Sequence, residues 1–200
     1  MIEISQLVSM AGFAIAASIS PGPVNVVALS SGLRHGLKSS MAHVSGATVG
    51  FTILLVTVGL GLDSLVQKFP ELLRITKWAG MLFLLYMAVK LAADSGDVGD
   101  ASNHKPSFWD GALMQWLNPK AWLASIAGMA AFAAGGAPYQ VWFFAGVYFI
   151  ICYVSIACWA AAGAALRGQI RDARHIRMLN RCLALTLVAS VIYLFYASSP

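Results

Sequence analysis

Ser20-Pro21-Gly22-Pro23 and Leu117-Asn118-Pro119-Lys120-Ala121 are two proline motifs that interrupt apolar stretches, one in each half of the chain. Proline has no backbone N–H, and its ring clashes with the carbonyl group four residues earlier, so each motif predicts a broken helix. In lipid the freed backbone groups cannot bond to water. Such breaks therefore persist only beside protein, water or a bound molecule.

The composition places the chain in a membrane. Of its 200 residues, 59% are hydrophobic and 10% are charged, and the mean hydropathy is +0.74. A soluble domain carries about 25% charged residues. One membrane domain of several spans fits this length, with no room for a separate catalytic domain. The net charge of +5 does not indicate nucleic-acid binding, because the basic residues are scattered at span ends. Phospholipid headgroups are the expected anionic partners.

The hydrophobic segments predict an all-α, polytopic membrane helix bundle of six transmembrane spans. A polar linker, 94–107, separates repeat one, 1–93, from repeat two, 108–200, within a single domain. Matching breaks in two halves are typical of internally repeated carriers whose site lies at the repeat interface. The spans are expected at 4–33, 44–62, 72–93, 108–133, 139–166 and 179–197, with breaks in the first and the fourth.

The distribution of basic residues predicts the orientation of these spans. Apart from Lys120, nine Lys and Arg residues fall on one side of the membrane and three on the other. The richer side faces the cytoplasm by the positive-inside rule, so both termini face outward. Three spans per half is an odd number, which makes the halves an inverted 3+3 repeat. The nine are Arg34, Lys38, Lys90, Lys105, Arg167, Arg171, Arg174, Arg177 and Arg181, and the three are Lys68, Arg74 and Lys77.

The two breaks together have the parts of a receptor for a zwitterion. The prolines free the carbonyl groups of Ala17, Ile19 and Gln115, which suit an ammonium group. The half-helices that restart after the breaks present amide groups and a positive dipole end, which suit a carboxylate. The substrate-binding candidates are Ser20, Pro21, Gly22, Pro23, Asn25, Asn118, Pro119 and Lys120. The competing interpretation is that the prolines only kink packed helices.

Lys120 constrains the cargo. It lies about ten residues, or about 15 Å, inside the fourth span, where an ammonium group needs a partner. The lysine is deprotonated, contacts backbone carbonyl groups, or meets the carboxylate of a substrate. No Asp or Glu lies in the interior of a predicted span, the nearest being Asp110. A carrier of cationic amino acids or metal ions would place a carboxylate there, so a small neutral amino acid fits better.

Two features of the second span leave alternatives open. His43 is the candidate for proton coupling, because imidazole titrates near pH 6.5. The alternative is that it caps the helix or faces headgroup water. Gly46 and Gly50 form a Gly-x-x-x-Gly pattern that allows close helix approach, either within the monomer or in a homo-oligomer.

The chain resembles the lysine-exporter (LysE) and threonine/homoserine-exporter (RhtB) superfamily of bacterial amino-acid efflux proteins. The resemblance rests on the two proline motifs, on Lys77-Trp78-Ala79-Gly80 and on Leu84-Leu85-Tyr86. It implies six spans in the bacterial cytoplasmic membrane and efflux of small amino acids or derivatives coupled to protons. After Ala121 the chain reads Trp122-Leu123-Ala124-Ser125 in place of the Phe-rich run of many relatives. In this it is more similar to the branch that includes cysteine and O-acetylserine exporters.

Other function classes fit less well. An intramembrane serine protease would need Gly-x-Ser-Gly and a histidine in a later span, and neither is present, so no enzyme activity is expected. Cys152, Cys158 and Cys182 have no Cys-x-x-Cys pairing and no metal-ligand spacing, so no metal site and no cofactor are expected. A cation or metal exporter of the same architecture remains an alternative, as does a non-transporting membrane assembly subunit.

Overall fold

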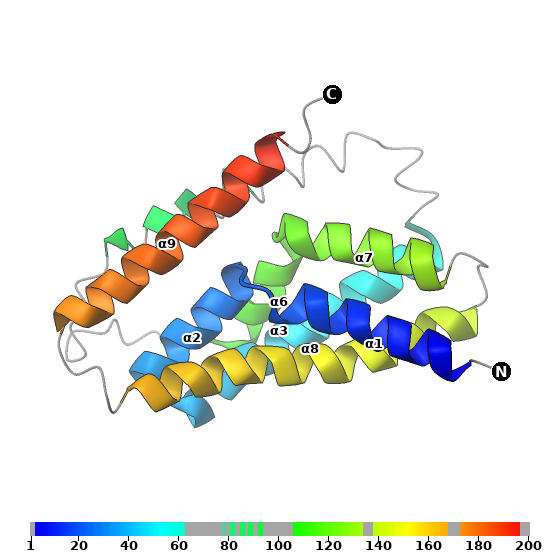
Figure 1. Ribbon diagram of the computed structural model, residues 1–200, viewed down its shortest axis with the longest axis horizontal. Helices are drawn as coiled ribbons and strands as arrows, with labels where there is room; N and C mark the ends of the chain where they lie inside the picture. Colours follow the sequence, from blue (N-terminus) through cyan, green and yellow to red (C-terminus); the bar gives the residue numbers. More distant parts are fainter. Residues whose placement is uncertain are drawn as a thin grey trace.

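The computed structural model is all-helical in the residues that it describes, which confirms the predicted class. These are residues 3–62, 106–133, 138–167, 173–196 and several positions between 78 and 93. They form seven α-helices and one π-helical turn (Figure 1). In chain order these are α1 (Ile4–Ile19), α2 (Pro23–His35), α3 (Leu37–Thr57), η1 (Val58–Leu62), α6 (Phe108–Trp116), α7 (Pro119–Phe132), α8 (Pro138–Leu166) and α9 (Ala173–Tyr196).

The first proline motif separates α1 from α2. The two helices meet at an angle of 62° across Ser20-Pro21-Gly22. Pro23 occupies the first position of α2, where its missing N–H would have no helical partner in any case. Gly22 precedes it in an extended conformation. The break predicted in the first span is therefore present.

The second proline motif separates α6 from α7. The first of these helices begins with a capping box, in which the Ser107 hydroxyl accepts from the Asp110 N–H and the Asp110 carboxylate accepts from the Ser107 N–H. Leu117 ends α6, Asn118 caps α7, and Pro119 is the first residue of α7. Both breaks therefore follow the same rule, with proline placed at the start of the second half-helix.

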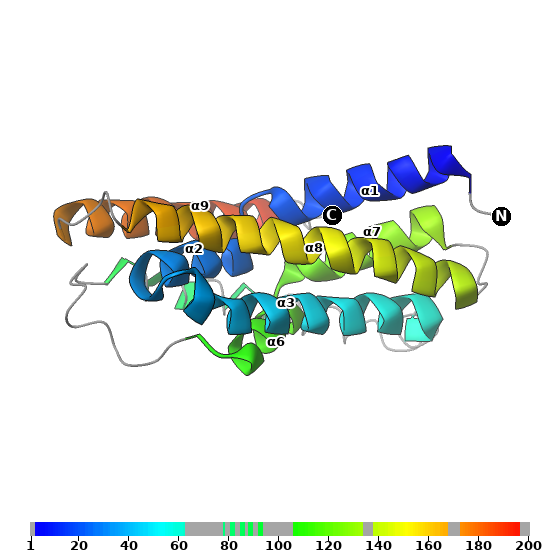
Figure 2. The ribbon, with the colours of Figure 1, turned by 90° about the horizontal axis from the view of Figure 1, so that it is seen from below.

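The long helix α8 runs the length of the bundle, along its lower edge in Figure 1 and between α1 and α3 in the view of Figure 2. It packs against α1 and α2 on one side and against α3 on another, while α6 packs against α3. Figures 1 and 2 both show α1 and α2 following α8 end to end, with the break beside its middle. The first break thus lies against α8 on one side, where protein can satisfy its backbone groups, while Pro21 is exposed on the other.

Small residues bring two helix pairs into backbone contact. A methyl group on Gly32 of α2 would overlap the Ala160 carbonyl group, and one on Gly163 of α8 would overlap that of Leu29. Gly46 likewise lies against the backbone of Phe108 in α6. The Gly-x-x-x-Gly pattern of the second span therefore makes its contact within the monomer, between α3 and α6.

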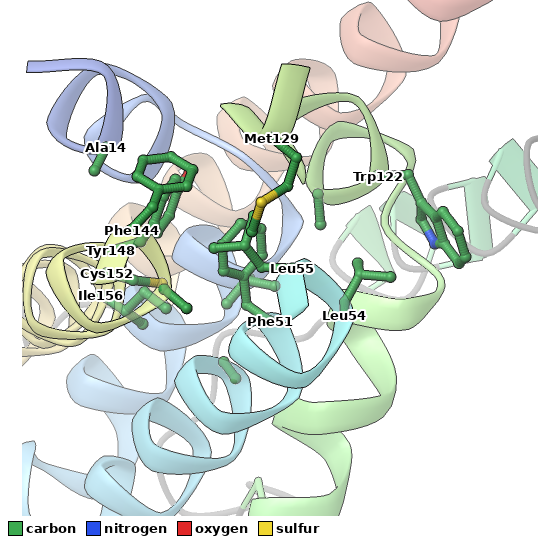
Figure 3. Packing of buried hydrophobic residues seen from close by; sticks show 14 of the residues in the cluster. Ala14, Phe51, Leu54, Leu55, Trp122, Met129, Phe144, Tyr148, Cys152 and Ile156 are labelled. Carbon is green, nitrogen blue, oxygen red and sulfur yellow. The ribbon is translucent and has the colours of Figure 1, made fainter. Parts of the chain in front are cut away.

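An aromatic and aliphatic cluster fills the space between α1, α3, α7 and α8. Figure 3 shows Phe144 and Tyr148 of α8 pointing toward Phe51 of α3, with Met129 of α7 beside them. The rings of Phe51 and Tyr148 have centroids 4.5 Å apart, and Phe13 of α1 packs against Phe144 at 6.3 Å. This cluster closes one end of the space between the breaks.

Three of the predicted spans coincide with units that can cross a membrane. By length and apolar composition, Leu37–Gly61 and Pro138–Leu166 can each cross a membrane, and the bent pair α1–α2 is a third such unit within the described residues. The predicted second and sixth spans are cores of longer helices that begin earlier, at Leu37 and Ala173, because their first turns carry polar residues outside the apolar stretch. Most of the predicted third span and of the 94–107 linker lies outside the described residues.

Candidate functional site

Lys120 joins the two breaks. Its ammonium nitrogen donates to the Ser20 carbonyl oxygen at 2.9 Å and to the Ser20 hydroxyl oxygen at 2.6 Å. A methyl group on Gly22 would lie 3.5 Å from the same nitrogen, which is an ordinary contact, so the lysine side chain lies directly beside the first break. Of the three possibilities given above for Lys120, the structure contains the contact with a backbone carbonyl group. This carbonyl group lies at the negative end of α1.

The carbonyl groups freed at the first break already have donors, contrary to the prediction that they receive a substrate ammonium. The Ser20 hydroxyl donates to the Ala17 oxygen at 3.3 Å, and the Trp159 indole to the Ile19 oxygen at 3.0 Å. The Asn25 amide donates to the carbonyl oxygens of Ser18 and Ser20 at 2.8 and 2.9 Å. The chain satisfies its own broken backbone here because an unpaired buried carbonyl is costly.

The second break is held in the same way. The Asn118 side chain accepts from the Lys120 backbone N–H at 3.1 Å, and its amide lies 3.4 Å from the Gln115 side-chain oxygen. The Gln115 backbone oxygen, also predicted to be free, accepts from the Asn118 N–H at 3.2 Å. The Trp122 indole donates to the Trp116 oxygen at 2.7 Å. Asn118 is therefore a helix cap, a role that its position before Pro119 allows.

A cavity of about 40 Å³ lies between the two breaks. A water molecule needs about 10–15 Å³ by this measure, so the space holds about three waters. Its polar lining comes from both breaks and is Ser18, Gly22, Asn25, Gln115, Asn118 and Lys120. Its apolar wall is formed by residues of α3 and α8, among them Phe51, Tyr148, Cys152 and Ile156, which Figure 3 labels.

The electrostatics of this cavity favour an anionic group. Among the lining residues that the structure describes, Lys120 is a cation and none is acidic. The N-terminus of α2, at Gly22, Val24 and Asn25, also lines the cavity and has no side-chain cap. The N-terminus of α7 is capped by Asn118. The uncapped end of α2 is therefore the better of the two for a carboxylate.

His43 lies close to this cavity without lining it. The His43 side chain is fully buried, and its Nε2 atom is 3.4 Å from the carbonyl oxygen of Val24. Val24 itself lines the cavity. Nδ1 has no hydrogen-bond partner. The alternative that His43 faces headgroup water is wrong, because α2 and α6 cover this part of α3.

The structure gathers the predicted site residues at one place. Gly22, Asn25, Asn118 and Lys120 line the cavity, whereas the prolines at 21, 23 and 119 shape the breaks without lining it. Ser20 takes part through its contact with Lys120.

Sequence analysis missed several lining residues. Ser18 and Gln115 each lie one helical turn before a proline, which is a signal that the motifs contained. Phe51, Tyr148 and Cys152 have no comparable signal, because they resemble any other apolar residue in a long helix. Among the described residues, no group of three His, Cys, Asp or Glu side chains is placed to hold a metal ion.

The comparisons with known proteins identify the family. A family model described as LysE type translocator matches residues 15–198. The chain belongs to this family. As a LysE type translocator it is a membrane protein, and the resemblance inferred from its motifs is confirmed.

The relatives of this translocator include two cysteine/O-acetylserine efflux proteins, from Escherichia coli (strain K12) and Shigella sonnei (strain Ss046). Each is 30% identical to it over 189 residues, which covers 92% of this chain and 94% of the relative. No solved structure matches the chain.

Proposed function

We propose that this chain exports a small neutral amino acid, or a derivative of one, through a six-span bundle built as an inverted 3+3 repeat. The observation that supports this function best is the contact between Lys120 of one break and Ser20 of the other, at the edge of a polar cavity. Two broken helices that share a site are the arrangement expected of a carrier with repeats. A bundle kinked only for packing has no need of a partly buried cation there.

In this proposal the substrate carboxylate binds between the Lys120 ammonium and the uncapped N-terminus of α2. Lys120 then exchanges its bonds to Ser20 for a charge-assisted bond to the carboxylate. The Ser20 oxygens that it leaves become acceptors for the substrate ammonium. The carboxylate of the substrate thus contacts the Lys120 ammonium, and its ammonium contacts the Ser20 oxygens.

The cargo is neutral overall because the cavity has one cation and no acid among its described lining residues. A cationic substrate would add a positive charge beside Lys120 with nothing to balance it. The relatives are named for efflux of cysteine and O-acetylserine, both neutral amino acids with short polar side chains. We include these two in the proposed substrate class.

Coupling to protons is assigned to His43. The ring is buried between the cavity and α6, where Asp110 is the carboxylate that acts on it electrostatically. Its contact with the Val24 carbonyl oxygen links it to the first turn of α2, so a change in ring charge acts on the end of that helix. The proposed orientation has both termini outside a bacterial cytoplasmic membrane, with phospholipid as the lipid partner. Association into a homo-oligomer stays an open prediction.

The test is efflux from proteoliposomes that contain the purified protein and labelled O-acetylserine, serine, lysine or arginine. We expect flux of the neutral compounds, and Lys120→Gln should lower it about 10-fold or more, the effect of losing a hydrogen bond to a charged group. Lys38→Gln is the matched control, because it removes an exposed lysine at the start of α3.

Other outcomes distinguish the alternatives. Flux of lysine, arginine or a divalent metal ion in place of neutral compounds would favour the cation exporter. No flux of any compound by a well-folded protein would favour the assembly subunit. If the wild type and Lys120→Gln exported neutral compounds at the same rate, Lys120 would have no role in substrate binding.

A further inference from the structure

Ser18 is a buried polar residue with no structural task. Its side chain is 8% exposed, and its hydroxyl oxygen makes no hydrogen bond. A buried hydroxyl in a folded protein is normally paired, since leaving it unpaired weakens the fold. Among the described side chains with such an unpaired buried atom, Ser18 is the one that lines the cavity between the breaks.

The surroundings of Ser18 are apolar apart from two groups on α8. Phe51 and Ile156 form the nearby wall of the cavity, and the ring of Phe51 is stacked on that of Tyr148. Tyr148 and Cys152 are polar side chains on α8 that lie near the Ser18 hydroxyl and interact with it, without the full geometry of a hydrogen bond. A group that enters the cavity therefore meets an unpaired hydroxyl at Ser18, beside the apolar wall formed by Phe51 and Ile156.

The position of Ser18 relative to Lys120 limits the size of the substrate side chain that can reach the Ser18 hydroxyl. Ser18 lies in the last turn of α1, and Ser20, the partner of Lys120, follows the end of that helix two residues later. The cavity holds about three waters in total. A molecule whose carboxylate and ammonium lie at Lys120 and Ser20 can thus reach Ser18 only with a short side chain.

We propose that Ser18 is the specificity-determining residue of this site and that its hydroxyl bonds the polar γ atom of the substrate side chain. The favoured substrates are amino acids with one side-chain carbon followed by oxygen or sulfur. Serine and cysteine belong to this class, whereas 2-aminobutyrate has the same shape with a methyl group at the γ position. This inference rests on the proposed function, because it assumes that the backbone of the substrate lies at the breaks.

The test is the ratio of serine efflux to 2-aminobutyrate efflux in proteoliposomes. We expect Ser18→Ala to lower this ratio about 2- to 12-fold, the range for one hydrogen bond, while 2-aminobutyrate efflux is kept. Ser9→Ala is the matched control, because Ser9 lies on the same helix and bonds its own backbone at an exposed position. The control should leave the ratio unchanged.

A second measurement separates recognition from folding. The Ser18 hydroxyl makes no bond in the empty protein, so Ser18→Ala should have a melting temperature equal to that of the wild type or higher. A lower melting temperature together with an unchanged ratio would show a structural role and overturn the proposal. An unchanged ratio in a stable protein that carries both compounds would also overturn it, while leaving the proposed function intact. If the wild type exports no amino acid, both the proposed function and the role of Ser18 are refuted.

Discussion

Gly163→Ala is the substitution whose effect the structure determines most directly. Gly163 lies in α8 where that helix touches the backbone of α2. An added methyl group would overlap the Leu29 carbonyl oxygen and lie 2.9 Å from the Leu33 nitrogen. Ordinary contacts of this kind begin at about 3.4 Å, and both obstacles are backbone atoms that cannot turn aside. The two helices must therefore separate by at least half an ångström.

Gly146→Ala provides a reference in the same helix. A methyl group there would meet nothing within 4 Å, so the substitution should stabilise α8 by about 0.5–1 kcal/mol through helix propensity alone. Gly163→Ala gains the same helix propensity but introduces a steric clash between α2 and α8. Such overpacking lowers the free energy of unfolding by about 1–3 kcal/mol, and by more where backbone must move. We expect a net loss of about 2–3 kcal/mol at position 163.

The assay is thermal unfolding of the purified proteins in one detergent. At about 2–4 °C per kcal/mol for a chain of this size, Gly163→Ala should melt about 4–12 °C below the wild type. Gly146→Ala should melt at the wild-type temperature or slightly above it. Equal melting temperatures for the two variants would refute the backbone contact between α2 and α8.

Two further substitutions test the groups around the breaks. Asn25→Ala removes the donor for the carbonyl oxygens of Ser18 and Ser20, so it should lower the free energy of unfolding by about 1–3 kcal/mol, measured by denaturant titration; unchanged stability would show that other groups satisfy those oxygens. His43→Gln keeps a donor near the Val24 oxygen but cannot titrate, so efflux should persist and lose its stimulation by an imposed proton gradient. Undiminished stimulation would exclude His43 as the coupling group.

The sequence predicted the breaks well because proline acts locally. The missing N–H and the fixed φ of Pro23 and Pro119 require a new helix start wherever they occur, whatever surrounds them. The same local logic placed Lys120 beside the break, and the length of the apolar stretch indicated that its ammonium group needs a partner. These parts of the site needed no knowledge of tertiary contacts.

The partners of the broken ends were beyond local reasoning. Ile19 was expected to offer a free carbonyl oxygen, yet it bonds to Trp159, an indole that sequence analysis had no reason to bring near it. Phe51 and Tyr148 came together for a similar reason, through the packing of α3 on α8. Pairings of this kind depend on which helix faces meet, and uniformly apolar helices give little signal about their faces.

The distance along the chain between the first break and its partners has a consequence for biosynthesis. Lys120 follows Ser20 by 100 residues, and Trp159 follows Ile19 by 140. A ribosome adding about 5–20 residues per second needs about 7–28 s to produce that indole. During this time the nearby side chains that can bond its carbonyl groups are those of Ser20 and Asn25, which are made at the break or moments after it. The backbone carbonyl groups of the newly inserted first span therefore lack part of their hydrogen bonds until the second half of the chain has been made.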